Sequence, residues 1–201
     1  MRRILSFAFA GLAGTFFVLV GFAQAQVDIA VGGSTPWSTK NTTSSIAYNA
    51  PPLKGGTYPM ASAQYMLTDR LGVEVEGAFR YHDGVYNGYQ KFRPLLYDVN
   101  AVYQRKLPHK TKLELMAGIG GETLIFYNQY VYCNNVTGAC RSFLNDNHLL
   151  LHAGLGIRYN FWRRFFARPE VHYSFVPDNF EFHSDNLYRL GVSIGYSFGS
   201  R

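Results

Sequence analysis

The chain has 201 residues, a formal net charge of +6 and two cysteines. This length suits a single domain, and the modest, dispersed positive charge gives no reason to expect a nucleic-acid partner. The cysteines form no CxxC motif and have no companion His/Cys cluster, so the sequence predicts neither a metal site nor a cofactor.

The first 25 residues are predicted to be a secretory signal peptide. Two arginines follow the initiating methionine, residues 4–22 are largely apolar, and Ala23-Gln24-Ala25 has the small-x-small pattern that signal peptidase recognises. We therefore expect cleavage before Gln26 and a mature domain of residues 26–201. The alternative is an uncleaved membrane helix, because the apolar stretch is just long enough to cross a bilayer.

Cys133 and Cys140 both remain in the expected mature chain. An exported protein meets an oxidising compartment, where such a pair can be bridged. The bridge would close a short loop and stabilise the fold by about 2–3 kcal/mol. The sequence thus predicts a structural disulfide.

Apolar residues of the mature region recur with a period of 2, which is typical of β-strands, and not with the helical period of 3.6. Between residues 148 and 161, for example, Leu149 and Leu151 share one face, whereas His148, His152 and Arg158 share the other. Eight segments follow this pattern: Val27–Gly33, Thr57–Leu67, Leu71–Tyr81, Leu95–Gln104, Lys112–Phe126, His148–Phe161, Phe165–Phe175 and Tyr188–Phe198.

The connections between these segments alternate in length. Those at 68–70, 107–111 and 162–164 are short, and four are long: 34–56, 82–91, 127–147 and 176–186. Short turns at one end and long loops at the other, with an even strand count, are typical of bacterial outer-membrane barrels. We therefore predict an all-β fold, an eight-stranded antiparallel up-and-down transmembrane β-barrel. The alternative is a soluble barrel of the lipocalin type.

In a membrane barrel the apolar face meets lipid and the polar face fills the lumen. An eight-stranded barrel is only wide enough inside for its own side chains, and unpaired charges in that space would be costly. We therefore predict an inward network of paired charges and an occluded lumen. Its members are Asp28, Glu74, Glu76, Arg80, Asp98, Glu114, Glu122, Arg158, Arg168, Glu170 and Arg189.

Aromatic residues make up 16% of the chain and gather near the ends of the predicted strands. Such residues form girdles at the two membrane interfaces of outer-membrane barrels. The residues predicted for this role are Tyr65, Tyr103, Tyr159, Phe161, Trp162, Tyr173, Tyr196 and Phe198.

The last predicted strand alternates apolar and small residues through to Tyr196-Ser197-Phe198. It resembles the C-terminal strand of outer-membrane barrels that the barrel-assembly machinery recognises, although Gly199-Ser200-Arg201 follow the last aromatic residue. With its eight strands and signal peptide, the mature chain resembles the OmpA-like, opacity-type outer-membrane β-barrel superfamily. The resemblance implies a bacterial outer-membrane location and contact with membrane lipid and with the assembly machinery. Because only these three residues follow the last predicted strand, we expect this chain to lack the peptidoglycan-binding domain of the longer relatives.

His172-Tyr173-Ser174 resembles the H-x-S pair of the lipid A 3-O-deacylase family, in which a histidine would activate a serine. The Asn-Ala-Gly expected after the serine is replaced by Phe175-Val176-Pro177. The predicted register also turns His172 and Ser174 into the lumen, whereas attack on lipid needs an outward site. We therefore predict no catalytic site.

The function expected from this pattern is that of a structural or surface-interaction barrel whose long loops contact an extracellular ligand, because loops carry most binding residues. A narrow channel for ions or small solutes is the alternative. A lipid A deacylase-like enzyme is a third hypothesis.

Overall fold

The computed structural model describes residues 26–39, 53–86, 90–133, 140–177, 179, 181–182 and 185–199. Only the backbone is described for residues 128–133 and 140–142. The predicted signal peptide and the middle of the first long connection lie outside these ranges. Among the described residues, no helix is long and apolar enough to cross a membrane.

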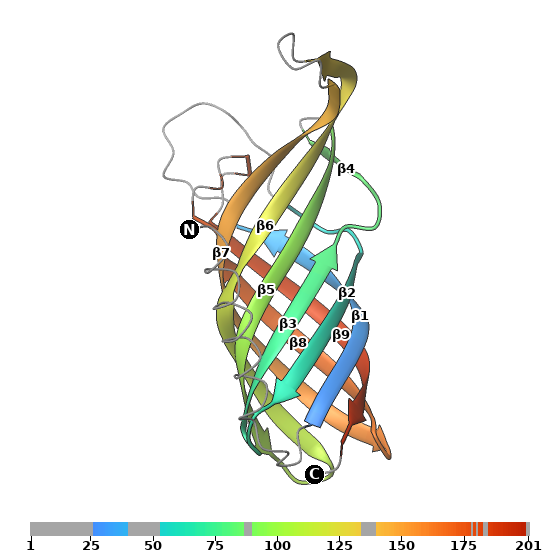
Figure 1. Cartoon of the computed structure of the whole chain (residues 1–201), viewed down its shortest axis with the longest axis vertical. Coiled ribbons are helices and arrows are strands. Elements are labelled where there is room, and N and C mark those ends of the chain that lie inside the picture. The colour runs from blue at the N-terminus through green and yellow to red at the C-terminus, as the bar shows by residue number, and fades with distance from the viewer. Residues whose placement is uncertain are drawn as a thin grey trace, which may run out of the picture.

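Antiparallel strands make up nearly all of the described chain (Figure 1). They are β1 (Gln26–Ser38), β2 (Tyr58–Met66), β3 (Leu71–Phe79), β4 (Gly84–Tyr86), β5 (Gln90–Lys106), β6 (Thr111–Cys133), β7 (Cys140–Trp162), β8 (Phe165–Phe175) and β9 (Asn186–Phe198). Eight of them close into a barrel in the order β3, β2, β1, β9, β8, β7, β6 and β5, with β3 paired to β5. The prediction of an eight-stranded up-and-down barrel is therefore confirmed.

The structure differs from the prediction in the long connections. The range 82–91 contains the short strand β4, which pairs with β5. The range 127–147, predicted to be a loop, is mostly a continuation of β6 and β7 as a hairpin, with a register shift between Tyr127 and Tyr132. Asn, Asp and Gly in this range have low β-propensity, but the two segments satisfy each other's backbone hydrogen bonds. This hairpin projects beyond the rest of the barrel (Figure 1).

Short turns join the strands at one end of the barrel, here called the turn end; the other is the loop end. In the turn after β2, the backbone N–H groups of Arg70 and Leu71 donate to Thr68 Oγ1 at 3.3 and 2.9 Å. The turn after β5 places His109 and Lys110 in the left-handed region, with φ of 61° and 60°. For residues other than glycine that conformation costs about 1–2 kcal/mol.

The middle of the barrel is apolar outside and polar inside. Along β3, Val73 and Val75 are exposed, at 38% and 54%, whereas Glu74 and Glu76, which alternate with them, are buried. A soluble barrel has the opposite arrangement, so the lipocalin alternative is wrong. The exposed band of aliphatic side chains is the apolar belt, and it is the surface that a transmembrane barrel presents to lipid.

Toward the loop end the arrangement reverses. Lys91 is exposed on β5, and Thr123 Oγ1 donates to Asn147 Oδ1 at 2.8 Å across the outer face of β6 and β7. Inside lies the inner apolar cluster, formed by Leu53, Tyr86, Phe92, Leu96, Leu124, Phe126, Leu150, Val176, Phe182 and Leu187. Polar outside and apolar inside is the pattern of a β-structure in water.

Candidate functional site

Charged side chains gather inside the barrel between the turn end and the inner apolar cluster. Strand alternation turns them inward, because every second residue of a strand faces the same side. The buried charged residues of this lumen network are Asp28, Glu74, Glu76, Asp98, Glu114, Glu122, Arg158, Arg168, Glu170 and Arg189. Among the described residues, seven buried carboxyl groups and three buried arginines therefore share the interior.

Arg158, from β7, occupies the level nearest the turn end. Its guanidinium pairs with Asp28 of β1 and donates to Ser197 Oγ at 2.5 Å. It also lies 3.6 Å from Glu114 Oε1 and stacks over the Phe166 ring, at 3.7 Å from the centroid. One arginine of β7 thus contacts side chains of β1, β6 and β9.

Arg168, from β8, forms the next level. Its Nη1 donates to Glu74 Oε2 at 2.6 Å and to Glu114 Oε2 at 3.1 Å, and its Nη2 donates to Ser62 Oγ at 3.2 Å. Its Nε lies 2.7 Å from Glu170 Oε2, as an ion pair outside hydrogen-bonding geometry. Multidentate pairing of this kind offsets part of the desolvation that burial imposes on each charge.

Arg189, from β9, pairs with Glu76 one level further toward the loop end. Beside this pair, His152 and His172 stack with ring centroids 5.0 Å apart, and His152 Nε2 lies 2.8 Å from His172 Nδ1. Gly154 leaves room for the two rings, because a Cβ there would lie only 3.2 Å from His172 Nδ1.

Two residues predicted for the network lie apart from its centre. Glu122 is fully buried and accepts a hydrogen bond from Asn179 Nδ2 at 2.9 Å. Arg80 lies against the inner apolar cluster, with its guanidinium carbon 5.3 Å from the Phe92 ring centroid. Among the residues that the structure describes, neither takes part in the ion pairs around the three buried arginines.

The prediction missed the inner apolar cluster altogether. Val176 and Phe182, from the connection before β9, are 0% and 1% exposed within it. The Tyr86 hydroxyl donates to the Glu181 carbonyl at 2.7 Å and so ties β4 to the same connection. The sequence contained a sign of this cluster, because the apolar residues Phe92, Leu124 and Phe126 all occupy positions that strand alternation turns inward.

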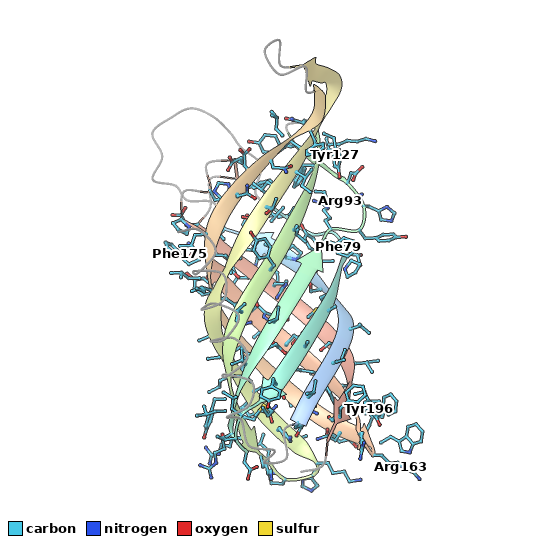
Figure 2. All side chains as sticks on the ribbon, viewed as in Figure 1. Phe79, Arg93, Tyr127, Arg163, Phe175 and Tyr196 are labelled. Carbon is cyan, nitrogen blue, oxygen red and sulfur yellow. The ribbon has the colours of Figure 1, made fainter. Side chains whose placement is uncertain are left out.

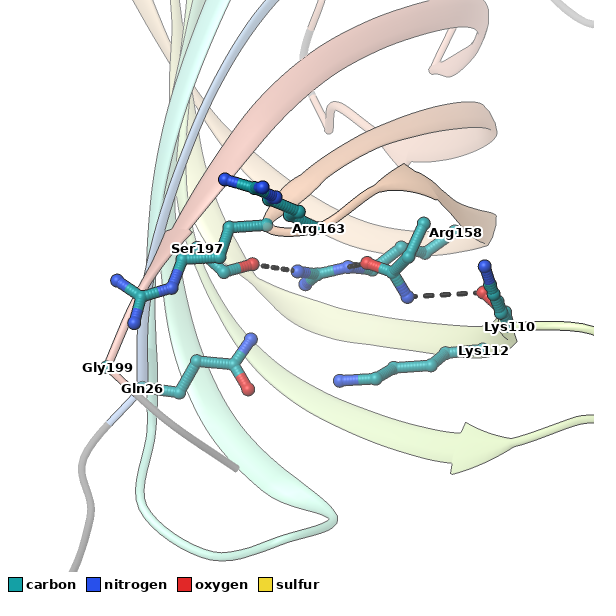
Figure 3. A pocket seen from close by; sticks show the side chains of 9 residues that line it. Gln26, Lys110, Lys112, Arg158, Arg163, Ser197 and Gly199 are labelled. Carbon is teal, nitrogen blue, oxygen red and sulfur yellow. Dashed lines mark hydrogen bonds between the residues drawn. The ribbon is translucent and has the colours of Figure 1, made fainter.

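A pocket of about 540 Å³ opens at the turn end, beside Arg158 (Figure 3). Lys110, Lys112, Arg163 and Arg164 also line it. Asn160 Nδ2 donates to the Lys110 carbonyl at 3.2 Å across its wall. The lining contains five cationic residues and no carboxylate, so the pocket is suited to small anions.

The eight predicted interface aromatics all lie on the outer face and are partly or largely exposed. Seven of them, all except Tyr173, come from the turn-end parts of their strands, where Tyr196 is labelled in Figure 2. Phe79 and Phe175 mark the loop-end side of the belt in the same view. There Tyr188 stacks on Trp37 at 5.9 Å and lies 5.3 Å from Tyr173.

His172 and Ser174 both point into the barrel, where they are 1% and 7% exposed. The nearest partner of the His172 ring is His152, not the serine. The arrangement therefore presents no serine–histidine pair to the lipid-facing surface.

Cys133 and Cys140 face each other in the backbone register at the far end of the hairpin. Their side chains lie outside the described residues, so the disulfide stays a prediction.

No protein-family model and no curated protein sequence matches the chain. Several solved structures do. Ail, the attachment invasion locus protein of Yersinia pestis, in complex with the heparin analogue sucrose octasulfate, matches with 16% identity and a TM-score of 0.57, covering 87% of this chain and 99% of that one.

Two Pseudomonas aeruginosa barrels match equally well in TM-score. The N-terminal β-barrel domain of OprF is 17% identical, with a TM-score of 0.57 over 87% of this chain and 98% of that one. The outer-membrane protein OprG is 16% identical, with a TM-score of 0.57 over 90% of this chain and 99% of that one. The resemblance to small OmpA-like barrels is thus confirmed in the fold: this is a β-barrel of the bacterial outer-membrane type.

Proposed function

We propose that the protein is a non-enzymatic, surface-interaction barrel of the bacterial outer membrane, in which an occluded barrel anchors a projecting hairpin. The observation that carries this proposal is the length of β6 and β7, which have 23 residues each, against nine in β2 and β3. A strand needs about 9–11 residues to cross a bilayer. The outer parts of β6 and β7 therefore extend well beyond the membrane.

The projecting hairpin carries exposed apolar side chains above the belt. Phe143 and Leu144 of β7 are 42% and 54% exposed, although Asn145 and Asn147 beside them are polar. Phe143 lies opposite Tyr127 in the register. Adjacent exposed apolar residues on a polar surface favour contact with another molecule, so this hairpin is the ligand-binding element of the proposal.

Occlusion of the lumen is the second part of the proposal. The ion pairs of Arg158, Arg168 and Arg189 occupy successive levels, and the inner apolar cluster follows them toward the loop end. Planar-bilayer recordings of the purified protein should give no large, stable conductance.

The proposal includes the predicted Cys133–Cys140 disulfide at the tip of the hairpin, where it would rigidify the binding element. Its further partners are membrane lipid around the apolar belt and the assembly machinery during insertion. Mass spectrometry of the alkylated, unreduced protein should find neither thiol modified.

The experiment that tests the proposal replaces residues 127–143 by Asn-Gly, a favoured two-residue hairpin turn that keeps Phe126 opposite Leu144. Heat-modifiable migration on gels checks that the barrel still folds. Bacteria that display this variant should adhere to host-cell layers and to plastic far less than bacteria that display the full chain. Unchanged adherence by a folded variant would contradict the hairpin's role.

Point variants refine this test. Phe143→Ser with Leu144→Ser should reduce adherence, because it removes the exposed apolar surface and leaves the backbone pairing intact. Asn145→Ser is the matched control on the same strand and should leave adherence unchanged.

A narrow anion channel is the second candidate function, and the basic turn-end pocket favours it. If that function holds, recordings would show a small anion-selective conductance that Lys112→Gln lowers.

A lipid A deacylase is disfavoured by the inward position of Ser174. Overexpression should leave lipid A acylation unchanged, and Ser174→Ala should make no difference to it.

A further inference from the structure

Several buried acceptor atoms of the described lumen network lack a hydrogen-bond donor, and four of them belong to three neighbouring side chains. They are Glu76 Oε2, both carboxylate oxygens of Glu170, and His172 Nε2. The three side chains are 0%, 0% and 1% exposed, and a ligand atom from each lies within 4.8 Å of the others. Buried polar atoms are nearly always paired, so this cluster of acceptors without donors indicates a missing positive group.

The hydrogen bonds around the histidines leave a lone pair on His172 Nε2. Asn100 Nδ2 donates to Asp98 Oδ1 at 2.5 Å, which turns Asn100 Oδ1 toward His152. That oxygen accepts from His152 Nδ1 at 2.6 Å, so His152 Nε2 must accept from His172 Nδ1 at 2.8 Å. In neutral imidazole only one nitrogen carries a proton, and His172 Nε2 is therefore free to bind a cation.

The balance of charges in the interior also indicates a missing cation. The buried residues include seven carboxyl groups but three arginines. Arg189 engages Glu76 through Oε1 and Arg168 approaches Glu170 at Oε2, so the other oxygen of each carboxylate has no cationic partner. An excess of negative charge in a confined, desolvated space is costly unless a cation or a proton offsets it.

We infer that Glu76, Glu170 and His172 form a binding site for one divalent transition-metal cation inside the barrel. One imidazole and two carboxylates suit zinc and its first-row neighbours. His172 Nε2 lies 3.7 Å from Glu170 Oε2, so the Glu170 carboxylate, whose Oε1 has no hydrogen-bond partner, lies beside the free ring nitrogen. The site is separate from the hairpin of the proposed function.

The surroundings of His172 match those of known metal ligands. A metal-bound histidine usually donates its other ring N–H to a fixed acceptor, which holds the ring in place. Here His172 Nδ1 donates to His152, and the chain continues to Asn100 and Asp98. The sequence prediction missed this site because its residues come from β3 and β8 and show no ligand spacing along the chain.

The test uses the mature protein refolded in detergent, either with one equivalent of Zn²⁺ or with EDTA, because a buried site fills most readily during folding. After desalting, elemental analysis should find about one zinc per folded chain in the first sample. His172→Asn keeps a donor near the Nδ1 position but removes Nε2, and Glu76→Gln removes a carboxylate; each should abolish retention. Asn100→Ala should weaken binding at least about tenfold.

The control is His82→Asn combined with His109→Asn, which removes two exposed histidines and should retain zinc. A correctly folded wild-type barrel that retains no zinc would overturn the inference, as would zinc lost from this control but not from His172→Asn. If the lumen variants fail to fold, X-ray absorption of the wild-type zinc complex decides. One nitrogen among oxygen ligands supports the site, and a shell with no nitrogen or with several overturns it.

Discussion

The two halves of the barrel have opposite interiors. Around Arg168, in the half that the apolar belt surrounds, ion pairs fill the interior. Around Phe92 and Phe182, toward the loop end, the interior is a hydrophobic core with aromatic rings 5.3 Å apart. Because the same strands run through both halves, the solvent outside decides which residues each half buries. Where lipid covers the wall the polar residues turn inward, and where water covers it the apolar residues do.

The largest effect is expected from the polar half. Arg168→Met leaves the carboxylates of Glu74, Glu114 and Glu170 buried without their shared partner. Removing one member of a buried ion pair costs about 3–5 kcal/mol. Urea denaturation in lipid vesicles should show a loss of this size in the free energy of unfolding. Arg163→Met, on an exposed turn, is the control and should change little.

A matched pair of substitutions tests where the belt ends. Val75→Arg places a charge in the middle of the lipid-facing wall, which costs about 2–4 kcal/mol near the midplane of the bilayer. Thr123→Arg makes the equivalent change on the outer face of β6 beyond the belt, where the cost should be about 0–1 kcal/mol. Equal losses of unfolding free energy in vesicles would disprove the proposed boundary.

A substitution in the apolar half should cause a smaller loss of unfolding free energy. Val176→Ala removes two buried methyl groups from the inner apolar cluster, at about 0.8 kcal/mol for each plus a cavity term. We expect a loss of about 1–2 kcal/mol on urea denaturation. Val85→Ala is the control, because Val85 is 59% exposed. If both variants lose the same amount, the cluster does not act as a core.

The smallest effect is a gain at the turn end, outside both interiors. Lys110→Gly removes the cost of a left-handed conformation at a residue with a side chain, but it also makes the unfolded chain more flexible. The net gain should be up to about 1 kcal/mol of unfolding free energy. A loss would mean that the Lys110 side chain itself stabilises the turn.

Strand alternation was enough to predict the barrel and the inward side of each strand. Along β3 it placed Glu74 and Glu76 inside. A one-residue slip would have turned the valines into the lumen and the charged glutamates toward lipid. The prediction failed where the alternation fades, in β4 and in the outer parts of β6 and β7. Those segments are held by pairing with a neighbouring strand, which a single stretch of sequence does not reveal.

The partners inside the barrel were also beyond prediction. Arg158 meets Asp28 across 130 residues of chain, and the stagger of the strands around the barrel decides which residues share a level. Likewise, His152 and His172 each look isolated in the sequence. Only the alignment of β7 with β8 brings the rings together.

The buried arginines have a consequence for the order of assembly. Each lies on one of the last three strands, and each pairs with a carboxylate from β1 or β3: Arg158 with Asp28, Arg168 with Glu74, and Arg189 with Glu76. The first strands therefore emerge during export with negative charges that nothing yet neutralises. Burying those charges is costly until the C-terminal third of the chain supplies its arginines, so we expect entry into the bilayer and closure of the ring to be coupled, late events.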